Sequence, residues 1–314
     1  MRLISITRNP IPNGAIVGRF KGYDGKPLRY ARWEPTVSKR HGTICVFTGY
    51  SEYIEKYFET VSDLRRRGFY VAVMDWRGNG ASYRPTNDPR KGHIHDFSEY
   101  ERDIECYMRD IITPSCPPPF IALAHSMGGN IILRYISRPE NFFNRIVLSS
   151  PMVKIHSSIL YLPSEVIHIL CKSAITLGWR KAYVFGGNAY DGIMKDFDTN
   201  KLTSSYERYL RNYKLQQVAS SLLVGSPTIG WLNAALRSIK TINHPDYFAK
   251  LRVPALIFSA GMDTVVPSQA INEYATRLKV GTGIFLPDSK HEILQEKNNI
   301  RAQFWATFDA YFDI

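Results

Sequence analysis

The chain has 314 residues, of which 44% are hydrophobic and 22% charged, so it can bury a substantial core and is not a disordered protein. Its net charge of +12 would attract nucleic acid, anionic lipid surfaces or acidic substrates. The lysines and arginines are spread along the chain and no nucleic-acid recognition module is present, so we predict no nucleic-acid partner.

The first predicted elements are two strands near the N-terminus. Residues 1–25 mix basic side chains with prolines and lack the apolar core of a secretory signal. Strand-forming segments at 16–20 and 28–33 lie on either side of Asp24-Gly25, a typical turn sequence. They predict an antiparallel hairpin that leads into the fold.

Six further apolar segments rich in β-branched residues alternate with segments of helical period. They lie at residues 43–47, 69–74, 120–124, 145–149, 255–259 and 283–286. Each is nearly continuous in apolar character, as strands covered on both faces should be. The pattern therefore predicts an α/β fold with a mostly parallel central sheet flanked by helices. The first crossover helix is expected over 52–67, because apolar residues recur there at helical spacing and Gly68 follows.

The alternation of strands and helices stops after Pro151 and resumes near Val253-Pro254. The intervening segment carries aromatic residues and isolated glycines but few strand-like runs. We therefore predict a core in two parts, residues 1–151 and 246–314, with an inserted, mainly helical cap at 152–245.

Two observations bear on where the protein acts. The most apolar stretch, residues 159–177, is interrupted by charged side chains, so no membrane-spanning helix is predicted. The four cysteines lack the spacing of a zinc site or a disulfide framework. They are Cys45, Cys106, Cys116 and Cys171. We predict reduced thiols in a cytoplasmic protein and leave open a peripheral contact with the inner face of the membrane.

The most specific motif is LAHSMGG at residues 123–129, between a predicted strand and a helical pattern. A strand-to-helix turn of this type is a nucleophile elbow, which lifts the serine Oγ clear of the sheet. The turn requires small residues two positions before and after the serine, and Ala124 and Gly128 meet that demand. The motif predicts an α/β-hydrolase fold with Ser126 as the nucleophile.

A nucleophilic serine needs a general base, and the base needs a carboxylate to orient it. In α/β-hydrolases the acid follows a late strand and the histidine follows the last one. Asp263 and His291 occupy these places and are predicted to complete the triad. Asp288 and Asp246 remain alternative acids, although neither is placed at the end of a strand.

Negative charge that develops on the substrate's carbonyl oxygen must be stabilised by backbone N–H groups. The N–H of Met127, directly after the nucleophile, is the first expected donor. The second is expected from the turn after the strand at 43–47, where Gly49 allows a close approach of the backbone and Tyr50 supplies the N–H.

The chain resembles the lysophospholipase and monoacylglycerol lipase branch of the α/β-hydrolases. Four blocks carry the resemblance: TGY at 48–50 with EKYF at 55–58, DWRGNGAS at 75–82, the elbow at Ser126, and the segments of Asp263 and His291. In this group the polar residues of the second block brace a loop beside the active site. The resemblance implies that structural role for Asp75, Arg77 and Ser82.

Within that branch the similarity to bacterial lysophospholipases is greatest, through DPRKGH at 88–93 and GSPTIGW at 225–231. The chain departs from the group's lipases in having Thr48 where they commonly have histidine. We expect Thr48, His125 and Trp231 to lie at the substrate pocket, with His125 forming part of its wall.

No metal or other cofactor is expected. His93, His95 and Asp96 suggest a ligand set, but the metallohydrolase pattern His-x-His-x-Asp-His would need an aspartate at 97 and a histidine at 98. Phe97 and Ser98 stand there instead.

The predicted activity is hydrolysis of a carboxylic ester, that of a lysophospholipid or a monoacylglycerol. The alternatives are a proline-type aminopeptidase or thioesterase on the same fold, and a non-catalytic ligand-binding homologue; nothing in the sequence indicates the oligomeric state. An aminopeptidase of this type needs acidic cap residues, whereas residues 152–245 contain eleven lysines and arginines against five acidic residues. This excess favours an anionic or lipid-facing substrate and contact with anionic membranes.

Overall fold

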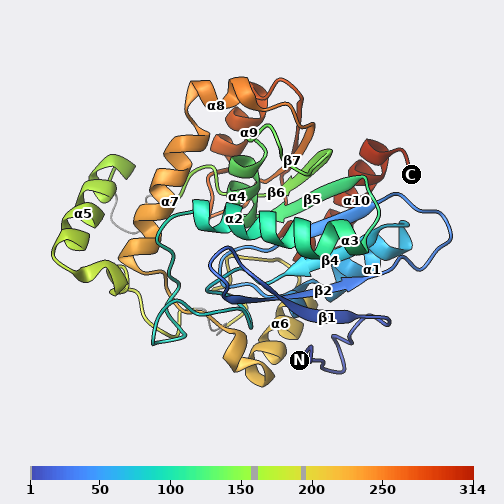
Figure 1. Ribbon diagram of the computed structural model, residues 1–314, viewed down its shortest axis with the longest axis horizontal. Helices are drawn as coiled ribbons and strands as arrows, with labels where there is room; N and C mark the ends of the chain where they lie inside the picture. The colour runs from blue at the N-terminus through green and yellow to red at the C-terminus, as the bar shows by residue number, and fades with distance from the viewer. Residues whose placement is uncertain (1, 157–161, 192–195) are drawn as a thin grey trace.

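A single eight-stranded sheet forms the centre of the computed structural model, which describes residues 2–156, 162–191 and 196–314 (Figure 1). The strands, in their order across the sheet, are β1 (Ile16–Lys21), β2 (Pro27–Trp33), β4 (Tyr70–Met74), β3 (Thr43–Phe47), β5 (Phe120–His125), β6 (Arg145–Ser149), β7 (Ala255–Ala260) and β8 (Gly281–Leu286). β1 pairs with β2 and β2 with β4 in antiparallel fashion, and the remaining pairs are parallel. The predicted mostly parallel sheet is confirmed.

Ten α-helices and several shorter helical turns occur in the described part of the chain. The α-helices are α1 (Phe58–Arg66), α2 (Ser98–Tyr107), α3 (Thr113–Ser115), α4 (Met127–Tyr135), α5 (Ser164–Thr176), α6 (Tyr206–Val218), α7 (Ile229–Ile242), α8 (Pro245–Lys250), α9 (Ser268–Arg277) and α10 (Asn298–Phe312). The short turns are η1 (Ile54–Tyr57), η2 (Met108–Ile112), η4 (Trp179–Lys181), η5 (Ser220–Leu222) and η6 (Ile293–Gln295).

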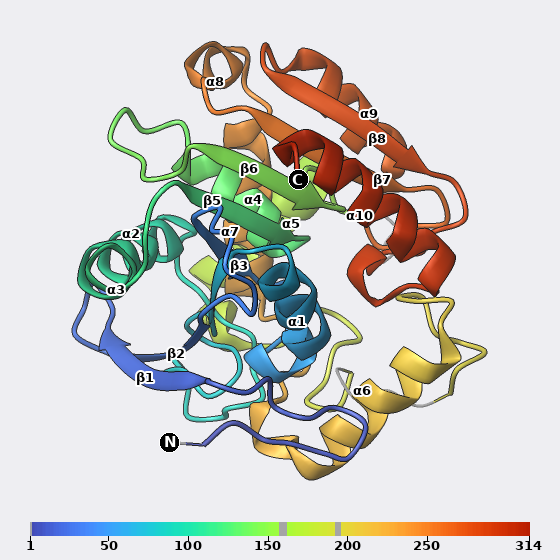
Figure 2. The same ribbon diagram turned by 90° about the vertical axis from the view of Figure 1, so that its right-hand side faces the viewer.

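Alternate side chains of the central strands point to opposite faces of the sheet, and each face has its own core. In β3, Cys45 and Phe47 pack in a core that includes residues of α2, α4 and α9. Ile44 and Val46 pack on the other face with residues of α1 and α10. Figure 2 shows α1 and α10 on the same side of the sheet. Because both faces are covered, the central strands can be apolar throughout.

The predicted strands agree with the observed ones to within two residues at each end, but one expectation was wrong. The strand predicted at 283–286 is not covered on both faces. β8 is the last strand in the sheet and pairs only with β7, and Phe285 is 52% exposed. An edge strand has fewer neighbours to cover it, so its apolar character does not imply burial.

The helices α5, α6 and α7 follow β6 and precede β7 in the chain, within the segment 152–245 for which a cap is predicted. α5 packs against α7 and lies at the periphery of the molecule, whereas α6 lies below the sheet in the same view (Figure 1). Of the apolar stretch 159–177, residues 159–161 lie outside the described residues. No helix in the described ranges is long and apolar enough to cross a membrane.

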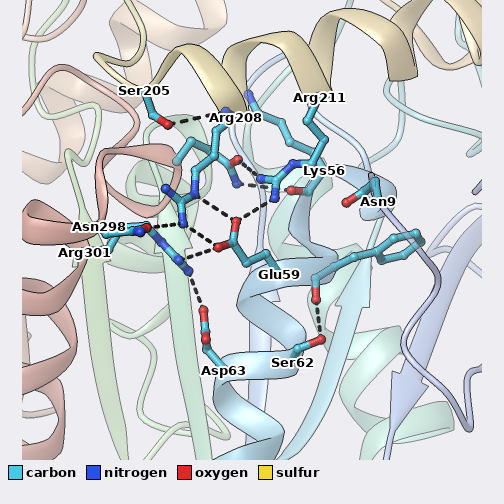
Figure 3. Close-up of polar contacts among 12 residues, drawn as sticks. Asn9, Lys56, Glu59, Ser62, Asp63, Ser205, Arg208, Arg211, Asn298 and Arg301 are labelled. Atoms are coloured by element: carbon cyan, nitrogen blue, oxygen red, sulfur yellow. Dashed lines mark hydrogen bonds and ion pairs between the residues drawn. The ribbon is translucent and has the colours of Figure 1, made fainter. Parts of the chain in front are cut away.

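A network of ion pairs fixes α6 to the core (Figure 3). Glu59 of α1 accepts hydrogen bonds from Arg208 and Arg211 of α6 and from Arg301 of α10, each at 2.6 Å. Arg301 also pairs with Asp63. Burial raises the pKa of Glu59, but the three guanidinium groups outweigh it and lower the pKa to about 2. α6 is therefore attached to the α/β core by charge as well as by packing.

Replacing Glu59 by glutamine should destabilise the protein, because Arg208 and Arg211 would lose their only paired carboxylate in the described chain and Arg301 would keep only that of Asp63. Breaking a buried ion pair costs about 3 kcal/mol, and we expect a decrease of that order in the free energy of unfolding by urea. Glu207→Gln, on the exposed side of α6, is the matched control and should have little effect. Equal stability of the Glu59→Gln variant and the wild type would show that the network contributes nothing.

Candidate active site

Ser126 lies in the turn between β5 and α4 with a strained backbone, φ 50° and ψ −115°. A positive φ is uncommon for a residue other than glycine and marks a tightly constrained turn. Gly128 permits this turn, since a Cβ atom there would lie 2.5 Å from the Phe47 carbonyl oxygen and 2.6 Å from that of Thr48. The serine thus sits at the carboxyl end of the central strands, as the elbow motif predicts.

The structure brings Ser126, His291 and Asp263 together from three distant parts of the chain. His291 Nε2 is 3.0 Å from Ser126 Oγ, and His291 Nδ1 is 2.7 Å from Asp263 Oδ2. All three residues are buried. The alternative acids are elsewhere: Asp288 is exposed, and Asp246 lies 3.6 Å from His244.

Asp263 is held in its ionised form by several hydrogen bonds. Its Oδ1 accepts the backbone N–H groups of Val265 at 2.8 Å and Val266 at 2.9 Å. Burial raises the pKa of the carboxyl, but the bond from His291 and these two N–H groups outweigh it and hold the pKa below its ordinary value. Because a carboxylate only accepts, it selects the imidazole tautomer that carries its proton on Nδ1. The lone pair of Nε2 then faces the Ser126 hydroxyl.

Two backbone N–H groups are expected to bind the oxyanion, that of Met127, directly after Ser126, and that of Tyr50, which lines the same cavity as Ser126. Neither Tyr50 nor Met127 has a hydrogen-bond partner for its N–H within the described chain. The neighbouring N–H of Gly49, in contrast, donates to the Glu52 carboxylate. Of these three neighbouring N–H groups, only that of Gly49 is used by another residue of the described chain.

A buried charge cluster that the sequence analysis missed lies beside these groups. Lys56 Nζ is 2.8 Å from Glu52 Oε1 and 2.5 Å from Glu292 Oε1. Burial raises the pKa of Glu52, but Lys56 and His125 lower it to about 2. Burial raises the pKa of Glu292. Lys56 thus connects the loop of Gly49 to the loop of His291.

The family model described as serine aminopeptidase, S33 (Hydrolase_4) matches residues 38–298. The chain belongs to this family. It is a serine hydrolase of the α/β-hydrolase fold, as the resemblance implied.

Similar proteins carry names of lipid hydrolases. Lysophospholipase L2 of Escherichia coli is 28% identical over 292 residues, which cover 90% of this chain and 83% of that protein. Monoacylglycerol lipase of Mycolicibacterium smegmatis is 29% identical over 155 residues, 49% of this chain and 53% of that protein. A crystal structure of a soluble variant of monoglyceride lipase from Saccharomyces cerevisiae, in complex with a substrate analogue, superimposes with a TM-score of 0.74 at 17% identity. It covers 95% of this chain and 96% of that chain, which supports the fold.

A cavity of about 500 Å³ opens onto Ser126 and His291 of the hydrolase. His125 lines this cavity, as expected. Thr48 and Trp231 are not among the residues that line it: Thr48 is fully buried, and Trp231 packs edge-on against Tyr50 with ring centroids 4.8 Å apart. Tyr50 itself lines the cavity, so Trp231 stands behind the wall.

The loop residues considered as metal ligands have other contacts in the hydrolase. His93 Nδ1 is 2.8 Å from Thr228 Oγ1, and Asp96 pairs with Arg237 at 2.6 Å. No group of three or more His, Cys, Asp or Glu side chains in the described ranges is arranged to hold a metal ion.

The block at 75–82 braces the loop as the resemblance implies. Asp75 Oδ2 accepts from Arg29 Nε at 2.6 Å, and the Ser82 hydroxyl donates to the Asp75 carbonyl at 2.7 Å. Arg77 is buried and pairs with Asp103 at 2.6 Å. None of these side chains lines the cavity at Ser126.

His125 is a neutral buried imidazole whose ring centroid lies 4.8 Å from that of His291. Its Nδ1 is 3.0 Å from the Ser149 carbonyl oxygen. Burial lowers its pKa to about 4; Glu52 acts in the opposite direction, and His291 and Lys56 add to the lowering. His125 is therefore uncharged in the folded protein at neutral and mildly acidic pH.

This depressed pKa predicts a loss of stability on mild acidification. In the unfolded chain His125 binds a proton near pH 6.5, whereas in the folded protein it does so only near pH 4. Between these values the unfolded state binds more protons, so the free energy of unfolding should fall by about 2 kcal/mol from pH 7 to pH 5. Urea unfolding of the wild type and of His125→Asn should show a shallower pH dependence in the variant. His244→Asn, an exposed control, should keep the wild-type slope.

Proposed function

We propose that this serine hydrolase cleaves carboxylic esters of lipids, with lysophospholipids and monoacylglycerols as the candidate substrates. The observation that carries the proposal is the hydrogen-bonded chain from Ser126 through His291 to Asp263, at the edge of a cavity. The names of the relatives support the class of ester.

In the proposed mechanism Ser126 Oγ attacks the carbonyl carbon of the ester while His291 Nε2 takes its proton. Asp263 stabilises the imidazolium that forms, and the N–H groups of Tyr50 and Met127 bind the oxyanion. His291 then gives the proton to the leaving alcohol. Water repeats the sequence on the acyl-enzyme, which releases the fatty acid and restores Ser126.

A panel of substrates with one readout tests this proposal. Wild-type enzyme should hydrolyse monoacylglycerols, lysophospholipids and short aryl esters, and a fluorophosphonate should label it once. Acidic side chains such as Asp191 and Asp196 line the cavity, so the aminopeptidase alternative is tested as well. Aminoacyl amides are the substrates for that test. Hydrolysis of aminoacyl amides without hydrolysis of any ester would overturn the proposal.

We further propose that the cap, for which we retain the boundaries 152–245, contacts anionic membranes without crossing them. Large apolar side chains are exposed on and beside α5. They are Val166, Ile169, Leu170, Leu177, Trp179 and Phe185. Basic residues lie near the same helix: Lys172, Arg237 and Lys240, together with burial, lower the pKa of His168. An exposed apolar patch with a cationic border fits an anionic lipid surface.

Sedimentation with vesicles tests this contact. The protein should bind vesicles rich in anionic lipid at low salt and dissociate as salt rises, since each basic residue near the surface contributes about 1 kcal/mol that salt screens. Ile169→Asp combined with Trp179→Asp should abolish binding, whereas Val218→Asp, an exposed apolar residue on α6, should not. Absence of binding to strongly anionic vesicles at low salt would reject the contact and leave the triad untouched.

A further inference from the structure

The cavity at Ser126 contains two buried polar side chains that lack partners. Tyr209 and Asn212 lie one turn apart on α6, line the cavity, and are 5% and 3% exposed. The Tyr209 hydroxyl and both the Nδ2 and Oδ1 atoms of Asn212 have no hydrogen-bond partner in the described part of the chain.

Buried polar groups without partners are costly and uncommon, so a pair of them in one cavity indicates a ligand that completes their hydrogen bonds. The neighbouring residues Arg208 and Arg211 anchor the same helix to Glu59 of the core (Figure 3). Since this network restrains rotation of α6, Tyr209 and Asn212 are held toward the cavity.

The charges of the cavity wall limit which ligand fits. The charged side chains among the described lining residues are Glu52, Glu292, Asp191 and Asp196, against Lys56 and Lys201. Lys56 is already paired with Glu52 and Glu292. The basic excess of the cap therefore does not face Ser126, and a net anionic group would meet a wall in which carboxylates predominate.

We propose that Tyr209 and Asn212 bind the hydroxyl groups of an uncharged glycerol leaving group, which makes monoacylglycerols the preferred substrates. A hydroxyl both donates and accepts, and so do the amide of Asn212 and the phenol of Tyr209. The phosphodiester of a lysophospholipid only accepts hydrogen bonds and carries a negative charge, so it could not itself donate to Asn212 Oδ1 and would face the carboxylates of the wall. This inference rests on the proposed ester hydrolysis and assigns its substrate class.

Three esters of one fatty acid test the inference: the monoacylglycerol, the propyl ester without free hydroxyls, and lysophosphatidylglycerol, whose headgroup is anionic. Wild-type kcat/KM should be highest for the monoacylglycerol. Asn212→Leu and Tyr209→Phe should each lower kcat/KM for the monoacylglycerol about tenfold or more, and leave the propyl ester within about twofold. Tyr206→Phe removes a hydroxyl from an exposed position of the same helix and should change neither.

Two results would overturn the assignment. One is an equal decrease in kcat/KM for the monoacylglycerol and the propyl ester in Tyr209→Phe, or no decrease for either ester. Tyr209→Phe is the milder change and decides the test if Asn212→Leu does not fold. The other is a wild-type preference for lysophosphatidylglycerol. Failure of the proposed ester hydrolysis is a separate outcome, in which the wild type cleaves none of the three esters.

Discussion

Replacing Ser126 by alanine is expected to reduce kcat by about 10⁶-fold, because the proposed triad loses its nucleophile while the oxyanion donors remain. The fold should survive, since Ser126 Oγ has only the His291 contact to lose. The backbone of the elbow is held independently, by the bond from the Ser126 N–H to the Ser149 carbonyl at 3.1 Å.

Loss of esterase activity is measured together with fluorophosphonate labelling. Both should disappear in Ser126→Ala and persist in Ser62→Ala, a serine of α1 whose hydroxyl donates only to the Phe58 carbonyl. His291→Ala should be nearly as inactive as Ser126→Ala, and the double variant no worse than either, because nucleophile and base act as one unit. Labelling that survives in Ser126→Ala would assign the nucleophile to another residue.

The sheet and the elbow could be predicted because their signals are local. Continuous apolar, β-branched segments such as 43–47 have few alternatives to a buried strand. A glycine at position 128 indicates that the backbone of β3 lies close to the turn. The burial of β8 could not be predicted in this way, since an apolar run does not say whether its strand lies at the centre or the edge of the sheet.

The charged residues around the site were not predictable from local pattern. Glu52 and Lys56, four residues apart, have the spacing of an exposed pair on a helix, and only the tertiary fold places Glu292 against them. The net positive charge of residues 152–245 was likewise a poor guide to the charge of the cavity wall. Arg208 and Arg211 pair with Glu59, so their charges anchor α6 to the core rather than bind substrate.

Replacing Asp263 by asparagine should lower kcat about 10⁴-fold, less than the loss of Ser126 or His291. An asparagine could present its amide N–H to His291 Nδ1 and stabilise the wrong tautomer, and it could not balance the imidazolium. The side chain would keep its size and its place beside the Val265 and Val266 N–H groups. The measured loss of activity should therefore fall on kcat, with little change in KM.

Asp288→Asn is the matched control, because Asp288 is the other carboxylate of the loop that carries His291 and is exposed. It should retain wild-type kcat. The pKa of the Asp263 carboxyl is depressed in the folded protein, so its contribution to stability is complete above the unfolded-state value of about 3.9 and is lost only as the pH falls through the lower folded-state value. Asp263→Asn should therefore lose its stability difference from the wild type in strong acid and nowhere near neutral pH. If Asp288→Asn were as inactive as Asp263→Asn, the assignment of Asp263 as the acid of the triad would be wrong.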